Sequence, residues 1–96
     1  MRKYEIMFIV KTAMETEGAN KLYETYKNLI IEGKGTIDNS KELGQKKLAY
    51  EINKETNGFY FVVDFTANTE TINELDRRLG LDENIIRHLI IRLDEE

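Results

Sequence analysis

The sequence predicts an α+β protein with the ferredoxin-like order β-α-β-β-α-β, in which a four-stranded antiparallel sheet carries two helices on one face. Apolar residues alternate in four stretches with the period of two that is typical of half-buried strands. Two further stretches repeat apolar residues at helical spacing. Right-handed crossovers then bring both helices to the same face of the sheet. The 96 residues contain no proline and no linker, so one compact core is expected.

The first two elements are a strand over 3–11 and a helix over 15–32. The strand presents one row of side chains to the core: Tyr4, Ile6, Phe8 and Val10. The helix carries an amphipathic stripe: Ala19, Leu22, Tyr23, Tyr26, Leu29 and Ile30. Its start has two candidate caps, which are Thr12 with Glu15 or Thr16 alone. Gly33 in a left-handed conformation is expected to end it.

A long second strand over 36–53 and a third over 59–66 are expected to form a hairpin. The second strand should bend or bulge near Gly44, because glycine inside a strand often marks such a site. We place the turn at Asn57-Gly58, since both residue types tolerate positive φ.

The last two elements are a second helix and, after it, a final strand over 85–93. Either Asn68 or Thr69 would cap the helix, and Gly80 would end it. The apolar line of the helix comprises Ile72, Leu75 and Leu79.

One face of the predicted sheet has no helices to cover it. Apolar residues opposing the core rows would lie there: Met7, Ile9, Tyr60, Val62, Ile86 and Ile90. Exposed together, they would form a patch suited to a partner. Exposed singly, they would be ordinary surface residues.

A single domain is expected over 1–93, followed by an acidic tail over 94–96. The net charge is −4, and setting aside the three negative charges of the tail leaves −1. Such a body cannot coat nucleic acid by charge alone, but it can present a local basic face. No apolar stretch approaches the roughly 18 residues of a membrane span, and no signal peptide is expected. The lack of cysteine fits a cytosolic protein.

The usual groups for catalysis are missing. The chain has one histidine (His88), one serine (Ser40) and no cysteine, so no catalytic triad can be assembled. Acylphosphatases share this strand order, but they hold phosphate with an arginine in the loop after the first strand. Here that loop, over 11–17, has two acids and no arginine. With no clustered histidines and no calcium loop either, we expect no enzyme, no metal and no cofactor.

The strongest functional pattern is a set of cations among aromatic rings around the predicted hairpin. Tyr50 and Tyr60 lie there among four lysines: Lys41, Lys46, Lys47 and Lys54. Such a combination is typical of surfaces that bind a nucleic-acid backbone and its bases. The same lysines would also serve as solvated charges that deter aggregation of a sheet edge.

The final strand adds further cations. His88 lies beside Arg87, and Arg92 follows on the same strand. The two neighbouring arginines favour contact of His88 with RNA, whereas a lone histidine on a strand is more commonly a surface or packing residue.

The third strand partly matches the signature of RNA-recognition modules, which have the same strand order. Residues 58–62 supply its glycine, two aromatics and valine, but Asn57 and Asp64 stand where a basic and an aromatic residue are required. A stand-alone module binding single-stranded RNA would expose Phe59 and Phe61 under stacked bases. The alternation instead places both rings in the core.

Four blocks of the chain form a specific combination: Met1-Arg2-Lys3-Tyr4-Glu5; Leu43-Gly44 with Lys46 to Ile52 and Lys54; Gly58-Phe59-Tyr60; and Asp82 to Ile85 with Arg87. Together they resemble the bacterial small-subunit ribosomal protein six family over nearly the whole chain. The resemblance implies a non-enzymatic constituent of the small ribosomal subunit in the cytoplasm. It also implies binding to the central domain of 16S rRNA during assembly, as a heterodimer with small-subunit ribosomal protein eighteen.

The resemblance also implies an rRNA surface at matching positions: Arg2, Tyr4, Tyr50, Lys54 and Arg87. Lys46 and Lys47 stand where relatives often have arginine, and lysine keeps the charge but loses the bidentate fork. The predicted RNA-binding set is therefore Arg2, Tyr4, Lys46, Lys47, Tyr50, Lys54, Arg87, His88 and Arg92. We expect the cations from the beginning, middle and end of the chain to gather once the strands are laid together.

Overall fold

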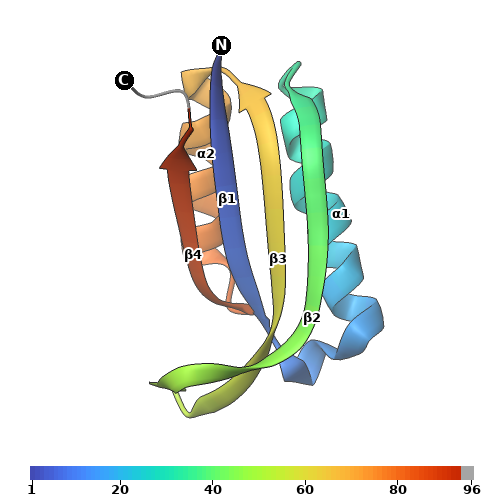
Figure 1. Ribbon diagram of the computed structural model, residues 1–96, viewed down its shortest axis with the longest axis vertical. Helices are drawn as coiled ribbons and strands as arrows, with labels where there is room; N and C mark the ends of the chain where they lie inside the picture. Colours follow the sequence, from blue (N-terminus) through green and yellow to red (C-terminus); the bar gives the residue numbers. More distant parts are fainter. Residues whose placement is uncertain (94–96) are drawn as a thin grey trace.

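The computed structural model describes residues 1–93, which follow the predicted order of strands and helices (Figure 1). The predicted acidic tail lies outside the described residues. The elements are β1 (Arg2–Lys11), a short 3-10 turn η1 (Thr12–Met14), α1 (Glu15–Glu32), β2 (Thr36–Ile52), β3 (Glu55–Ala67), α2 (Thr69–Leu81) and β4 (Ile85–Arg92).

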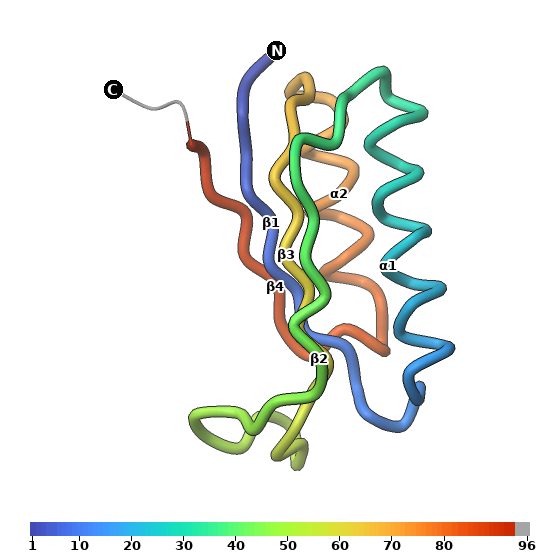
Figure 2. The backbone as a smooth tube through the Cα atoms, turned by 45° about the vertical axis from the view of Figure 1, so that its right-hand side comes forward, coloured from blue at the N-terminus to red at the C-terminus, as the bar shows by residue number. Residues whose placement is uncertain are grey.

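The strands form one sheet in the order β2-β3-β1-β4, and all neighbouring pairs are antiparallel. Both helices cover the same face of this sheet (Figures 1 and 2), which confirms the ferredoxin-like α+β fold. The core lies between the sheet and the helices, where Phe61 stacks between Phe8 and Tyr23 with ring-centroid distances of 5.3 and 4.7 Å.

The bounds of α1 agree with the prediction, and the helix ends at Gly33 as expected, but the predicted side-chain cap at its start and the left-handed conformation of Gly33 are wrong. Thr12 lies in η1, and Met14 occupies the N-cap position without a side-chain hydrogen bond. At the other end Gly33 has φ −80°, and Lys34 takes the left-handed conformation with φ 66°. Gly33 is needed for a different reason, because a Cβ there would collide with Oγ1 of Thr71 in α2.

The turn of the β2–β3 hairpin lies nearer the start of the chain than predicted. Ile52 pairs with Glu55, so the turn consists of Asn53 and Lys54, which have φ 48° and 68°. Asn57 and Gly58 lie within β3. Asn53 and Lys54 can form this turn because positive φ at two consecutive residues suits the twist of a two-residue hairpin, and asparagine tolerates positive φ well.

β2 bulges at Gly44 as predicted. The register with β3 shifts between Glu42 and Gly44, and Gly44 has φ 79°. Beyond this point the hairpin curls toward the side of the sheet that has no helices (Figure 2). The curl brings distal β2 over the open face, where the candidate site lies.

The start of α2 agrees with the prediction, because the side chain of Asn68 accepts a 2.8 Å hydrogen bond from the backbone N–H of Thr71. Its end does not. Gly80 lies inside the last turn, and the helix continues to Leu81. It ends at Asp82, whose backbone turns extended and whose carboxylate accepts hydrogen bonds from outside the helix.

Candidate nucleic-acid interface

The open face of the sheet is apolar near its centre. Cross-strand pairing places Met7 opposite Val62 and Ile9 opposite Tyr60, as expected for the row that opposes the core. The prediction that Ile90 lies on the open face is wrong, because Ile90 packs against the core on the helix side. The open row of β4 instead contains residues that pair with open-face positions of β1, namely Arg87, Leu89 and Ile91.

A β-bulge explains why the prediction for this row is wrong. Val10 pairs with Ile85 and Ile9 pairs with Arg87, so Ile86 is an extra residue in β4. One added residue reverses the facing of every later side chain relative to a simple count from the start of the strand. Leu89 and Ile91 are consequently 48% and 44% exposed on the open face.

The curled hairpin and the open face enclose an apolar groove of about 190 Å³. Leu48 is buried beneath the hairpin, whereas Tyr50 is 61% exposed. The lining residues are Met7, Ile9, Leu48, Ala49, Tyr50, Ile52, Tyr60, Arg87 and Leu89. The groove is thus a product of the curl and not of the flat sheet.

A hydrogen bond spans this groove from one edge of the sheet to the other. Nη1 of Arg87 in β4 donates to the hydroxyl oxygen of Tyr50 in β2 over 2.8 Å. β2 and β4 are the two outer strands of the sheet, with β3 and β1 between them. Sequence reasoning selected both residues but missed their contact, because it depends on the curl of the hairpin.

The hairpin cations have no carboxylate partners among residues 1–93. Lys46, Lys47 and Lys54 are exposed and form no salt bridge within that range, and the same holds for Arg87. Three of the four helix cations behave differently, since Lys27, Arg77 and Arg78 pair with glutamates, whereas Lys21 forms no salt bridge within that range. Two acids, Glu51 and Glu55, share the hairpin, so its excess of positive charge is small.

Three of the predicted residues lie toward the opposite end of the sheet. Arg2 pairs with Ala67, whereas Lys47 pairs with Asn57. These positions on β3 are ten residues apart, or about 33 Å along an extended strand. Tyr4 and Arg92 pair with each other near Arg2, so the expectation that all the cations gather at one place is wrong.

Tyr4 and His88 have partners inside the fold. The ring of Tyr4 is half-buried and stacks on Phe65 with centroids 5.9 Å apart. Nε2 of His88 lies 2.8 Å from Oδ1 of Asp76 in α2, which places His88 on the helix side of the sheet and away from Arg87.

Two carboxyl groups lie directly opposite each other on the open face. Glu5 pairs with Asp64 across β1 and β3. A hydrogen bond with Asp64 raises the pKa of Glu5 above its usual value, with burial and the negative charge of Asp64 adding to the effect and Lys41 opposing it. Oδ1 of Asp64 is buried and has no hydrogen-bond partner among residues 1–93.

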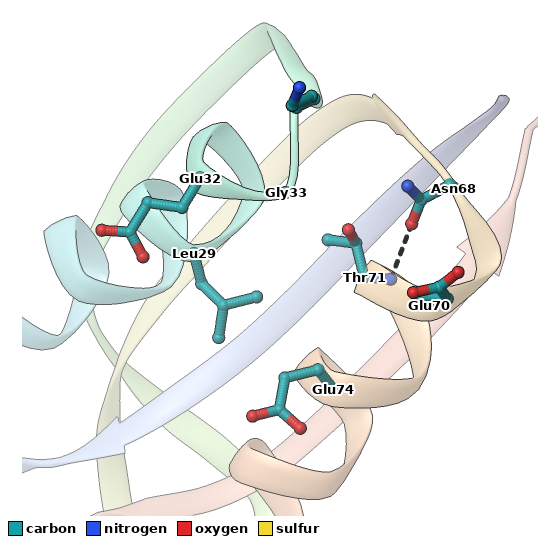
Figure 3. Close-up of a pocket in the computed structure, with 8 residues that line it drawn as sticks. Leu29, Glu32, Gly33, Asn68, Glu70, Thr71 and Glu74 are labelled. Carbon is teal, nitrogen blue, oxygen red and sulfur yellow. Dashed lines mark hydrogen bonds between the residues drawn. The ribbon is translucent and has the colours of Figure 1, made fainter.

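The helix layer is acidic where α1 ends and α2 begins. A groove of about 440 Å³ lies there (Figure 3), and Glu32, Glu70 and Glu74 are among its lining residues. Arg77 and Arg78 hydrogen-bond to Glu74 and lower its pKa to about 2, so it stays negative at neutral pH. Lys34 also lines this groove, and two arginines pair with Glu74, so its negative charge is partly offset.

Residues 1–93 offer neither a metal cluster nor a helix suited to a membrane. Within that range no three His, Cys, Asp or Glu side chains are placed to hold a metal ion together. Neither of the two helices there combines the length and the apolar character needed to cross a bilayer.

These features define a small ferredoxin-like α+β protein in which one side of the sheet is left open by the helices. The family model for ribosomal protein S6 matches residues 3–92. The chain therefore belongs to the ribosomal protein S6 family.

Individual proteins similar to this chain are also S6 proteins. The chain is 43% identical to small ribosomal subunit protein bS6 of Clostridium perfringens (strain SM101 / Type A) over 95 residues, which is 99% of this chain and 100% of the relative. It is 45% identical to the bS6 protein of Alkaliphilus oremlandii (strain OhILAs) with the same coverage. The crystal structure of 30S ribosomal protein S6 from Thermotoga maritima matches with a TM-score of 0.90 at 35% identity, covering 96% of this chain and 87% of that one.

Family membership confirms the predicted class. The chain is a structural protein of the small ribosomal subunit in the bacterial cytoplasm, and it is not an enzyme. The alternative, a stand-alone RNA-recognition module, is wrong. That module requires exposed Phe59 and Phe61, but Phe61 is 3% exposed and Phe59 packs against the core.

Proposed function

We propose that the chain binds the central domain of 16S rRNA during assembly, as a heterodimer with small-subunit ribosomal protein eighteen. The observation that carries the RNA part is the contrast between the two cation sets. Arg77 and Arg78 in α2 share the carboxylate of Glu74, whereas the hairpin lysines and Arg87 have no carboxylate partner among residues 1–93. Unpaired cations collected at one end of a sheet are suited to phosphate oxygens.

The hairpin end would act as the main phosphate contact. Lys46, Lys47, Lys54 and Arg87 neutralise phosphates and release counterions, which fixes the register of the protein on the RNA. Arg2 and Arg92, at the far end of the sheet, would form a separate second contact. We assign no direct phosphate contact to Tyr4 or His88, because Tyr4 stacks on Phe65 and His88 bonds to Asp76 on the helix side of the sheet.

The open face supports the protein partner. Leu89 and Ile91 are exposed beside the Glu5–Asp64 carboxyl pair, so this face combines apolar area with negative charge. A basic protein complements both properties, whereas RNA would be repelled by the carboxylates. One face would thus take the partner, while the hairpin cations face the RNA.

Titration of a central-domain rRNA fragment with the purified heterodimer, at several salt concentrations, tests this proposal. We expect affinity to fall as salt rises, and Lys46→Gln with Lys47→Gln to reduce the salt slope by about one for each phosphate that is no longer neutralised. Lys21→Gln, at an exposed lysine of α1, serves as the control and should leave the slope unchanged.

Two results would contradict the proposal. One is a heterodimer that shows no salt-dependent affinity for the fragment. The other is an equal loss of affinity for Lys21→Gln and for the hairpin pair, which would mean that only total charge matters.

A further inference from the structure

Arg87 is an exposed cation that has a hydrogen-bond partner within the fold. Its guanidinium carries five N–H donors, and within residues 1–93 its side chain forms one hydrogen bond, to Tyr50. No carboxylate within residues 1–93 forms a salt bridge with it. The side chain is therefore held by a neutral group that restrains it without cancelling its charge.

The hydroxyl of Tyr50 reaches Arg87 because the hairpin is held down on the sheet. Leu48 is 6% exposed beneath the curl, and Ile52 lines the same groove after Tyr50. These apolar contacts anchor the strand on both sides of Tyr50. The position of the tyrosine is thus set by packing, and the position of the guanidinium is set by the tyrosine.

We propose that Tyr50 is a positioning residue, whose hydroxyl holds the Arg87 guanidinium as a preformed site for a phosphate group of the RNA. The inference rests on the proposed function, since it assigns a role to one tyrosine within the same surface. Holding a long, flexible side chain in its bound geometry removes part of the ordering cost of binding. Tyr50 then acts through Arg87 and not as a platform for a stacked base.

A double-mutant cycle on RNA affinity tests this role. Tyr50→Phe keeps the ring and removes only the hydroxyl, so the heterodimer should bind the central-domain fragment about two- to tenfold more weakly. In an Arg87→Gln background the same change should have no effect. Tyr60→Phe is the matched control, because it removes a hydroxyl that lines the same groove but has no hydrogen bond within residues 1–93.

Salt dependence separates positioning from direct contact. Arg87→Gln should lower the salt slope by about one, because one phosphate is no longer neutralised. Tyr50→Phe should leave the slope unchanged, since the charge remains and only its geometry is released. In the free protein, ¹⁵N relaxation of the Arg87 side chain should show greater motion in Tyr50→Phe than in wild type or Tyr60→Phe.

The outcomes are distinguishable. Wild-type heterodimer that fails to bind the fragment would overturn the proposed function and this inference together. Normal binding by wild type and by Tyr50→Phe would overturn the inference alone. A loss of affinity in Tyr50→Phe that persists at full size with Arg87→Gln would also overturn it, because Tyr50 would then contact the RNA itself.

Discussion

Tyr26 of α1 donates a 2.7 Å hydrogen bond to Oδ2 of Asp82, the residue at which α2 ends. The other carboxylate oxygen, Oδ1, accepts a 2.9 Å hydrogen bond from the backbone N–H of Asn84. Asp82 therefore joins the first helix to the turn that leads into β4. The contact is only partly buried, but it connects residues 56 positions apart in the chain.

Replacing Tyr26 with phenylalanine should lower the free energy of unfolding by about 1 kcal/mol, because one carboxylate oxygen loses its donor. Burial, followed by the bond to Asp82, raises the pKa of Tyr26 above its usual value. Its stabilising contribution is therefore complete below about pH 10 and is lost as pH rises further, when the unfolded tyrosine ionises first. Urea unfolding at neutral and alkaline pH should show a smaller alkaline loss in Tyr26→Phe than in wild type, and an equal loss in both would contradict this role of Tyr26.

The Glu5–Asp64 pair should make the protein less stable at neutral pH than in mild acid. Because the folded-state pKa of Glu5 is raised, the folded chain binds this proton more tightly, and stability falls as pH rises above about 4.5. Asp64→Asn should flatten this dependence and add about 0.2–1 kcal/mol at pH 7, since like charges directly opposite in a sheet repel. Urea unfolding between pH 4 and pH 8 measures this, with the exposed Glu42→Gln as the control; an unchanged profile in Asp64→Asn would contradict it.

Gly58 should resist substitution because of packing. A Cβ at this position would collide with Cγ2 of Ile9 and lie 3.2 Å from Cδ1 of Ile86. Gly58→Ala should therefore destabilise the fold by about 1–3 kcal/mol. Truncating the obstructing side chain with Ile9→Ala should recover part of that cost, so thermal unfolding of the double variant should show strong non-additivity. Purely additive effects would contradict this packing explanation.

The two cation groups should behave as independent contacts. Lys54 lies at the tip of the hairpin and Arg2 lies toward the other end of the sheet. Lys54→Ala and Arg2→Ala should each lower the salt slope for rRNA by about one, and their free-energy effects should add. Filter binding of the heterodimer at several salt concentrations checks this. A marked coupling between the two variants would mean that both contact one short stretch of RNA.

Local pattern predicted the elements well because most core positions follow a simple period. The buried stripe of α1 and the core row around Phe61 and Phe65 were predicted correctly, because residues that share a buried face recur at a fixed spacing. Ends and turns were predicted less well. Gly33, Gly58 and Gly80 were each predicted to mark a turn or a helix end. In the structure, other side chains approach Gly33 and Gly58 closely, and Gly80 lies within α2.

The candidate site could be predicted only in part, because it depends on relations between strands. The sequence identified the cations of the hairpin, but their distance from Arg2 follows from the register of β3. The bulge in β4 moved Ile90 to the core side and exposed Leu89. Neither the register nor the bulge leaves a local signal in residue type.

The bulge at Gly44 gives the distal hairpin a point about which it can move relative to the rest of the sheet. β2 leaves the plane of the sheet there, and beyond it the hairpin meets the rest of the sheet through the groove and the Tyr50–Arg87 bond. If that bond and the apolar contacts of Leu48 and Ile52 were broken together, the distal hairpin would be able to move outward about Gly44. Slow motion in this protein should accordingly be concentrated in residues 45–57, with an amplitude that increases toward the tip.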